Sequence, residues 1–297
     1  MNFDSYLPYY TINDYLKKEF GSKVIKLSLN AGFTCPNRDG SKGVGGCIFC
    51  SELGSGDMAS DIKGQIELLS KKWTSNKYIA YFQSYTNTYA PIDELKEKFY
   101  SALKYPGVVG IAIATRPDCL DDDVLRLLNE LNRETFLWVE LGLQTTHDKT
   151  AEAINRCYPF SDFDKAIKSL SASNIKSVVH LIFGLPGETK AQMLDSVRLV
   201  CKYSPFGIKM HLLNIISGSA ITSLYPDYVP FDSMDEYVNL VADALEIIPP
   251  EITIHRLTAD APRELLIAPK WSYKKRTILN NLYKEMKSRG SYQGFHL

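Results

Sequence analysis

Three cysteines within one short segment have the residue type and the spacing to hold a metal centre. Cys47 and Cys50 form a C-x2-C pair, and Cys35 precedes them across a glycine-rich loop in CPNRDGSKGVGGCIFC. Thiolates are soft ligands that favour iron–sulfur clusters and zinc. Glycine-rich loops fold back readily, so Cys35 can approach the pair. The segment by itself leaves three alternatives open, which are an iron–sulfur cluster, half of a zinc site and a redox pair without a metal.

The other cysteines supply no obvious fourth ligand. Cys119 and Cys157 each stand alone, and Cys201 falls in an apolar helical pattern that favours a small buried side chain. A centre at this segment would therefore take three thiolates from the protein.

The elements that must position these cysteines alternate along the chain. Short runs rich in β-branched residues predict six strands, at residues 24–29, 78–83, 108–115, 136–143, 177–185 and 207–216. Amphipathic segments with helical periodicity separate them, at 92–104, 121–132, 163–173 and 191–203. Strands that alternate with helices form a parallel sheet with right-handed crossovers. We predict an α/β fold, a partial (β/α)6 TIM-like barrel with a C-terminal extension and an active site at the carboxyl ends of the strands.

This strand–helix alternation fades after about residue 217, which divides the chain into three parts. We expect an N-terminal extension at residues 1–22, the partial barrel at 23–217 and an α-rich, basic extension at 218–297. Within the last part, residues 232–248 and 274–290 have helical patterns, and residues 253–257 are a candidate for one more strand.

Composition narrows the class of protein. The 297 residues are 45% hydrophobic, which is enough for a large core, and Lys+Arg and Asp+Glu are equal at 34 each. Net charge therefore gives no argument for a nucleic-acid or membrane partner. We find neither a signal peptide nor a run of about 18 apolar residues, and we expect a cytoplasmic protein whose cysteines are free thiols or ligands.

Several motifs, taken together, resemble the radical S-adenosylmethionine (SAM) superfamily over roughly residues 20–290. They are NAGFTCPNRDG, GGCIFC, YFQSYTNTYAP, ATRPDCL, ELGLQTTHDKT, INR, HLIFGLPGE and IKMHLLNI. The usual cysteine spacing in that superfamily is C-x3-C-x2-C, whereas this chain has C-x11-C-x2-C. The expanded loop resembles a bacterial subfamily related to the Elongator-subunit and oxygen-independent coproporphyrinogen oxidase branches.

The resemblance implies two cofactors. Cys35, Cys47 and Cys50 would hold a [4Fe-4S] cluster, and the iron without a cysteine would bind the amino and carboxylate groups of SAM. Reductive cleavage of SAM there would give a 5′-deoxyadenosyl radical, with the electron supplied by a flavodoxin- or ferredoxin-like donor.

The resemblance also implies cofactor contacts at the strand ends. Phe49 would pack near adenine or simply cover the cluster, and the end of the second strand would meet the methionine amino group or cap its own turn. Glu140 and Gln144 resemble ribose-binding positions, and Arg156 resembles an arginine that approaches the methionine carboxylate. The full set of expected cofactor residues is Phe49, Ser84, Thr86, Asn87, Glu140, Gln144, Arg156, Gly184, Pro186 and Lys209.

Candidate substrate contacts come from charged residues near the predicted site and in the C-terminal extension. Arg116 would either face an anionic group or pair with Asp118, and His211 would either reach substrate or be a satisfied core residue. Residues 270–290 contain seven lysines and arginines against one acid, interleaved with aromatics, which suits RNA or a solvated helix. The full set is Arg38, Arg116, Asp118, His211, Lys274, Lys275 and Arg276.

Relatives that resemble this chain are connected with tRNA wobble-uridine modification. The resemblance therefore implies a radical SAM enzyme that converts 5-carboxymethylaminomethyluridine in tRNA to 5-aminomethyluridine. Two alternatives stay open, which are a radical SAM enzyme acting on a small metabolite or tetrapyrrole, and a non-catalytic RNA-binding protein with zinc or a cluster.

Overall fold

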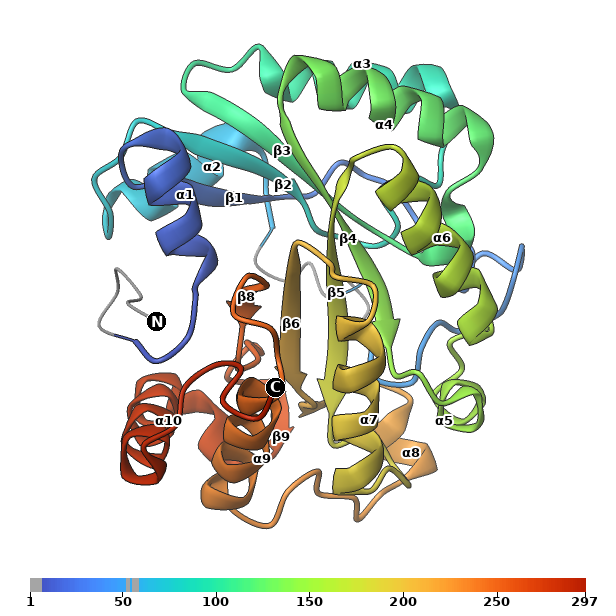
Figure 1. Cartoon of the computed structure of the whole chain (residues 1–297). Coiled ribbons are helices and arrows are strands. Elements are labelled where there is room, and N and C mark those ends of the chain that lie inside the picture. Colours follow the sequence, from blue (N-terminus) through green and yellow to red (C-terminus); the bar gives the residue numbers. More distant parts are fainter. Residues whose placement is uncertain (1–6, 52–53, 55–58) are drawn as a thin grey trace.

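Seven parallel strands form one curled sheet, in the order β1-β2-β3-β4-β5-β6-β8 (Figure 1). This computed structural model describes residues 7–51, 54 and 59–297, so the first six residues of the predicted N-terminal extension lie outside the described part. The order and the parallel pairing confirm the predicted α/β partial barrel. The strands are β1 (Ile25–Leu29), β2 (Tyr78–Phe82), β3 (Val108–Thr115), β4 (Phe136–Gln144), β5 (Lys176–Phe183), β6 (Gly207–Leu212) and β8 (Thr253–Arg256).

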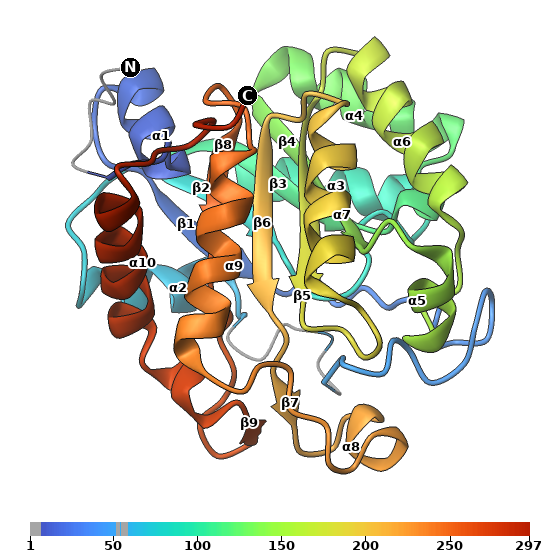
Figure 2. The same cartoon turned by 60° about the horizontal axis from the view of Figure 1, so that its bottom comes forward.

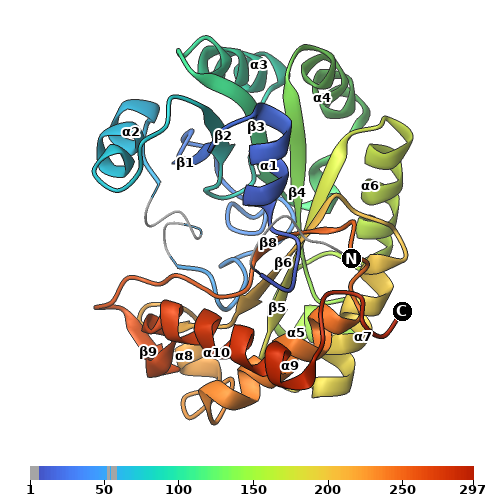
Figure 3. The ribbon, with the colours of Figure 1, turned by 60° about the vertical axis from the view of Figure 1, so that its left-hand side comes forward.

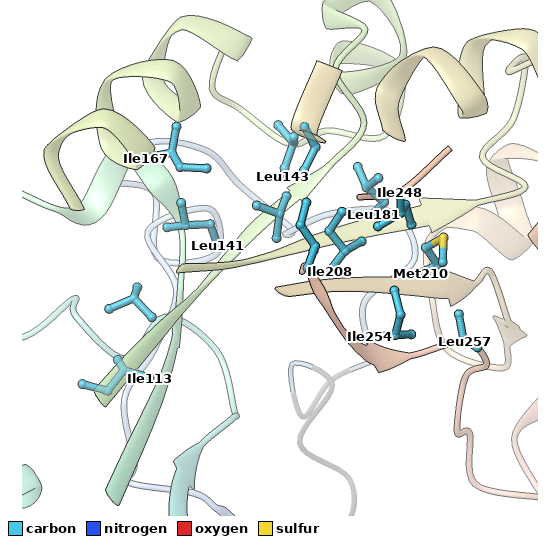
Figure 4. Packing of buried hydrophobic residues seen from close by; sticks show 14 of the residues in the cluster. Ile113, Leu141, Leu143, Ile167, Leu181, Ile208, Met210, Ile248, Ile254 and Leu257 are labelled. Atoms are coloured by element: carbon cyan, nitrogen blue, oxygen red, sulfur yellow. The ribbon is translucent and has the colours of Figure 1, made fainter. Parts of the chain in front are cut away.

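Helices cover the outer face of the sheet. They are α2 (Ile62–Ser70), α3 (Ile92–Leu103), α4 (Asp122–Glu134), α6 (Phe160–Ala172), α7 (Lys190–Cys201) and α9 (Met234–Glu246). In Figure 4, Ile167 of α6 and Ile248 after α9 pack with strand residues such as Leu141, Leu181 and Ile208. All of these side chains are buried. Burial of their outward-facing side chains under these helices explains why the strands are rich in apolar residues.

Helix α4 illustrates how the sequence specifies these elements. Asp121 caps its first turn by accepting a 2.9 Å hydrogen bond from the backbone N–H of Val124. Val124, Leu127, Leu128 and Leu131 recur at three- and four-residue intervals and are all buried. One apolar stripe thus faces the sheet while the opposite face stays polar, as the periodicity predicts.

The seventh strand comes from the predicted C-terminal extension. β8 confirms the candidate strand at residues 253–257, and it pairs in parallel with β6 as a seventh strand beside the six expected in the barrel. The expected strand at 207–216 in turn divides into β6 and a short β7 (Ile215–Ile216), which pairs antiparallel with β9 (Leu266–Ala268). The division of the chain at residue 217 stays a prediction, although the sheet continues beyond it.

Helix α1 (Ile12–Phe20) closes the amino-terminal end of the barrel, against the concave side of the sheet (Figure 3). Its Leu16 is buried in a cluster with Val24, Ile79, Trp138 and Val178. The backbone before α1 is tied to β8, because the N–H of residue 254 donates to the carbonyl of residue 10 at 2.7 Å. The open space of the barrel is therefore confined to the carboxyl ends of its strands.

Four shorter elements and one terminal helix complete the chain. Helix α10 (Lys275–Arg289) packs beside α9 (Figures 1 and 3). None of the described helices is long and apolar enough to cross a membrane. The remaining elements are η1 (Pro117–Cys119), α5 (Asp148–Ala153), α8 (Ile221–Leu224), η2 (Lys270–Tyr273) and α10 (Lys275–Arg289).

Candidate active site

A cavity of about 770 Å3 opens at the carboxyl ends of the strands and is lined by all three candidate cluster ligands, Cys35, Cys47 and Cys50. In Figure 2 the arrowheads of β5 and β6 point to this end, where β7, β9 and α8 also lie. The cavity continues from the cysteine loop down to side chains in the middle of β1, β4 and β6. Its volume is within the range of ordinary ligand pockets.

The three thiols are arranged around this cavity rather than at one point. Over the described residues, no three His, Cys, Asp or Glu side chains converge closely enough to hold a single metal ion. The Cys47 and Cys50 thiols hydrogen-bond each other, which raises the pKa of Cys47 and lowers the pKa of Cys50. An iron–sulfur cluster takes its thiolates at separate irons, so three soft donors facing one cavity fit that group.

Contacts from distant elements hold the long loop between Cys35 and Cys47, which we call the cluster loop (residues 35–50). The Lys42 ammonium lies 3.0 Å from the Asp118 carboxylate at the end of β3. The Asn37 amide donates to the carbonyl of Asn155 at 2.6 Å, and the Asn155 amide donates back to the carbonyl of Gly46 at 2.8 Å. The loop is therefore a fixed structure that presents the cysteines.

Arg116 and Asp118 form the structural pair that was one of the two alternatives. Two guanidinium nitrogens of Arg116 each donate to Asp118 at 2.9 Å, and a third donates to the carbonyl of Arg156 at 3.0 Å. Although burial alone would raise the pKa of Asp118, the adjacent Arg116 and Lys42 lower it. Arg116 lines the cavity but Asp118 does not, so the pair supports the cluster loop from behind.

Arg156 differs from the expectation that it reaches the methionine carboxylate. It lines the cavity but is only 1% exposed. Its N–H groups donate to the carbonyls of Leu143, Thr145 and Tyr158 and to the Asp148 carboxylate. With five donors and five bonds, the guanidinium has none left for a ligand. Its observed role is to order the turn that follows β4.

Glu140 lines the cavity, and its expected contact with a ribose stays a prediction. One carboxylate oxygen accepts from Trp138 Nε1 at 2.9 Å, and the other contacts His180 Nε2 at 2.8 Å and the ammonium of Lys209. The Lys26 ammonium lies 3.8 Å from the first oxygen. Although burial alone would raise the pKa of Glu140, Lys209, Lys26 and His180 lower it well below its usual range. Glu140 is thus a buried anion that organises its neighbours.

The other expected cofactor residues divide into two groups. Phe49, Thr86, Gln144 and Lys209 line the cavity. Ser84, Asn87, Gly184 and Pro186 are buried behind it. The Asn87 amide, for example, bridges β2 and β3 by donating to the carbonyls of residues 82 and 114. At Gly184, where φ is +87°, a Cβ would lie 2.7 Å from Pro230 and Phe231, so packing requires the glycine.

The expected substrate residues also separate. Arg38 and His211 line the cavity. Lys275 lines it too and pairs with Asp260 at 2.9 Å, whereas Lys274 and Arg276 are exposed at the start of α10. The His211 ring lies 5.2 Å from that of His180, and its Nε2 is buried without a partner among the described residues. His211 is therefore a cavity residue with a free polar atom.

Several cavity residues were missed by reasoning from the sequence. Lys26, Tyr81, His180 and Arg256 come from four different strands and meet around Glu140 or beside it. The available signal was a charged or polar residue within an otherwise apolar strand, as in VIKLSL and SVVHLIF. Such a residue is expensive to bury unless it serves a site or a partner.

Sequence comparison identifies the family. A profile described as the radical SAM superfamily matches residues 34–200, and one described as the radical SAM C-terminal domain matches residues 205–288. The chain belongs to the radical SAM superfamily. The protein is therefore a radical SAM enzyme with a [4Fe-4S] cluster and SAM as its cofactors, and the alternative of a non-catalytic RNA-binding protein is dropped.

Individual members of the superfamily are similar to this chain to different degrees. The uncharacterised protein YtqA of Bacillus subtilis is 48% identical over 96% of this chain and 92% of its own length. A tRNA uridine(34) acetyltransferase of Dehalococcoides mccartyi is 27% identical over 54% of this chain and 35% of its own length. Among solved structures, Elp3 of Methanocaldococcus infernus has a TM-score of 0.68 at 18% identity, covering 91% of this chain and 64% of that one. The last likeness supports the fold.

Proposed function

We propose that this radical SAM enzyme acts on tRNA and converts 5-carboxymethylaminomethyluridine at the wobble position to 5-aminomethyluridine. The observation that carries the proposal is the cavity, which joins the cysteines to a rim with an exposed aromatic and exposed cations. Trp73 lines the cavity and is 51% exposed, the exposed Lys72 next to it also lines the cavity, and the ammonium of the exposed Lys23 lies 3.2 Å from the centre of the Trp73 ring. An exposed aromatic beside cations suits an unstacked base and its flanking phosphates.

Similarity to a tRNA uridine(34) acetyltransferase supports the same substrate class. That relative is distant and shares only about half of this chain, so it supports a uridine in tRNA and not a particular reaction. The step that we propose removes the carboxymethyl group from the side-chain amine of the modified base as glyoxylate. The N-methylene would give a hydrogen atom to the 5′-deoxyadenosyl radical and one electron to the cluster, and water would hydrolyse the resulting imine to the free amine and glyoxylate.

Within the site, we assign each residue a role that its position allows. Cys35, Cys47 and Cys50 hold the cluster, and Phe49, Thr86 and Gln144 contact SAM from the cavity wall. When bound, the cluster and SAM supply a 5′-deoxyadenosyl radical, after one electron arrives from a flavodoxin- or ferredoxin-like donor. Arg38, which donates to the carbonyl of Ser51, fixes the chain after Cys50 and closes the cavity beside the cluster.

Nucleoside analysis of tRNA tests the proposal. In a strain that lacks this gene, 5-carboxymethylaminomethyluridine should accumulate and 5-aminomethyluridine should disappear, as measured by mass spectrometry of digested tRNA. The gene restores the profile, and a Cys47→Ala copy does not. An unchanged wobble-uridine profile in the deletion strain would rule out the proposed substrate.

A further inference from the structure

The cavity has an excess of positive charge that the cluster ligands do not explain. Counted over the described residues, eight lysines and arginines line it against two acids, Glu140 and Asp260. Arg116 and Arg156 are matched by their own carboxylates, Asp118 and Asp148. The excess of positive charge therefore comes from lining residues other than Arg116 and Arg156.

Four cations share the two acids in the deep part of the cavity and on its adjoining wall. The Lys26 ammonium lies 3.8 Å from the Glu140 carboxylate, and the Lys209 ammonium lies closer to it. Arg256 and Lys275 both pair with Asp260, at 3.2 Å and 2.9 Å. We call these four side chains the cationic floor. Its formal charge, with both acids ionised, is two units positive.

The environment of the cationic floor makes this excess costly. Lys209 is 3% exposed and Glu140 is fully buried, while Lys26 keeps 30% of its side chain open to the cavity. Burial and the neighbouring cations Lys26 and Arg256 lower the pKa of Lys209, against the opposing effect of Glu140. Burial and Arg256 also lower the pKa of Lys26, and Glu140 opposes them. An additional anion at this place would relieve the repulsion.

Hydrogen-bonding atoms without partners lie on the same wall. His211 Nε2 and Asn214 Oδ1 are buried and have no hydrogen-bond partner among the described residues. Both residues line the cavity. Unsatisfied buried polar atoms are costly. A ligand that reaches this wall gains by accepting a hydrogen bond from His211 Nε2, in the tautomer that protonates that nitrogen, and by donating an N–H to Asn214 Oδ1, because an amide oxygen only accepts.

We propose that the cationic floor binds a carboxylate that projects from the substrate base. This inference rests on the proposed function, because the carboxymethylaminomethyl side chain carries such a carboxylate. A backbone phosphate of a tRNA stays at the surface, whereas a flexible side group on an inserted base reaches the bottom of the cavity. Holding the carboxylate there places the neighbouring methylene in the same cavity as the cluster loop.

The test uses the free nucleosides 5-carboxymethylaminomethyluridine and 5-aminomethyluridine, titrated calorimetrically into the SAM-loaded enzyme without a reductant. The carboxylated nucleoside should bind at least about tenfold more tightly, since one charge-assisted hydrogen bond is worth that much. Lys26→Met and Arg256→Met, which retain an aliphatic stem, should remove this preference. Lys26→Arg should retain most of it, and Lys96→Met on α3 should retain all of it.

Each outcome has a defined meaning. Lys26 and Arg256 lie on two different strands, β1 and β8. Thermal melts of Lys26→Met and Arg256→Met check that both variants fold. Equal affinity of the wild-type enzyme for the two nucleosides would overturn the carboxylate site. Competition by inorganic phosphate as effective as that by the carboxylated nucleoside would also overturn it, because the floor would then be a phosphate site. The wild-type enzyme could prefer the carboxylated nucleoside while the deletion strain has an unchanged tRNA profile. That result would support the carboxylate site and rule out the proposed tRNA reaction.

Discussion

At the scale of single residues, one buried carboxylate organises the deep part of the cavity. Glu140 pairs with two lysines, accepts from Trp138 and contacts His180. Removing one member of a buried ion pair leaves the other charge uncompensated, which costs more than the pair itself contributes. The position of Lys26 and Lys209 in the cavity therefore depends on this side chain.

Glu140→Gln should lower the free energy of unfolding by about 3–5 kcal/mol, because Lys26 and Lys209 lose their shared anion. The matched control is Glu130→Gln on α4, whose carboxylate pairs with Lys96 on the surface and is 50% exposed. An exposed pair contributes only about 0–1 kcal/mol. Urea denaturation of both variants measures the difference, and equal stability of the two would contradict the role given to Glu140.

That the three cysteines line one site could be predicted, because their type and local spacing carry the signal. The partners of Glu140 could not be predicted, since Lys26, His180 and Lys209 lie on three strands far apart in the sequence. The pairing of β4, β5 and β6 places His180 and Lys209 beside Glu140, and the curl of the sheet brings Lys26 of β1 to them. The same limit applies to Arg156, whose five bonds depend on the turn after β4.

At the scale of elements, two other parts of the chain hold the cluster loop in place. It is fastened to the end of β3 through Lys42 and to the segment after α5 through Asn37 and Asn155. Gly43 sits where this packing is tightest, since a Cβ there would lie 2.1 Å from Asn37 Oδ1 and 2.7 Å from Cys157 Sγ. The long segment between Cys35 and Cys47 is thus held in place by residues outside the loop.

Gly43→Ala should reduce the iron content of the anaerobically reconstituted enzyme severalfold, because the added methyl displaces Asn37 and with it the loop that carries Cys47. Val44→Ala is the control, since Val44 is the adjacent residue and is 77% exposed. Iron and sulfide analysis measures both. Full cluster occupancy in Gly43→Ala would show that the loop adapts, contrary to the rigid arrangement described above.

At the scale of the whole molecule, the barrel is closed at one end and open at the other. Helix α1 fills the amino-terminal end, and β8 extends the sheet next to β6. The chain before α1 also meets the C-terminal segment, where the N–H of residue 293 donates to the carbonyl of residue 8 at 2.9 Å. Ligands are therefore confined to the carboxyl ends of the strands, where the cysteines lie.

Leu16→Ala should lower the free energy of unfolding by about 2–5 kcal/mol, because it leaves a cavity in the cluster that joins α1 to the strands. Leu224→Ala on α8 is the matched control. Leu224 is 59% exposed, and its replacement should change stability by no more than about 0.5 kcal/mol. Denaturation of both variants is the measurement, and similar values for the two would show that α1 does not close the barrel.

The alternation of strands and helices made the barrel predictable. The strand at β8 was a candidate from the sequence, but its pairing with β6 was not predicted, because the long segment between them does not have the strand–helix alternation of the barrel. The position of α1 inside the amino-terminal end of the barrel also could not be predicted from the sequence. Its apolar residues recur with the same periodicity as those of a helix that covers the outside of the sheet.

Anaerobic turnover with tRNA shows whether this protein carries out the proposed reaction. The reconstituted enzyme is incubated with SAM, a reductant and tRNA from the strain that lacks this gene, and both 5′-deoxyadenosine and the tRNA nucleosides are measured. We predict that 5′-deoxyadenosine forms while 5-carboxymethylaminomethyluridine falls and 5-aminomethyluridine rises, and that Cys47→Ala abolishes all three changes. Cleavage of SAM by the wild-type enzyme with no change in the tRNA nucleosides would contradict the account.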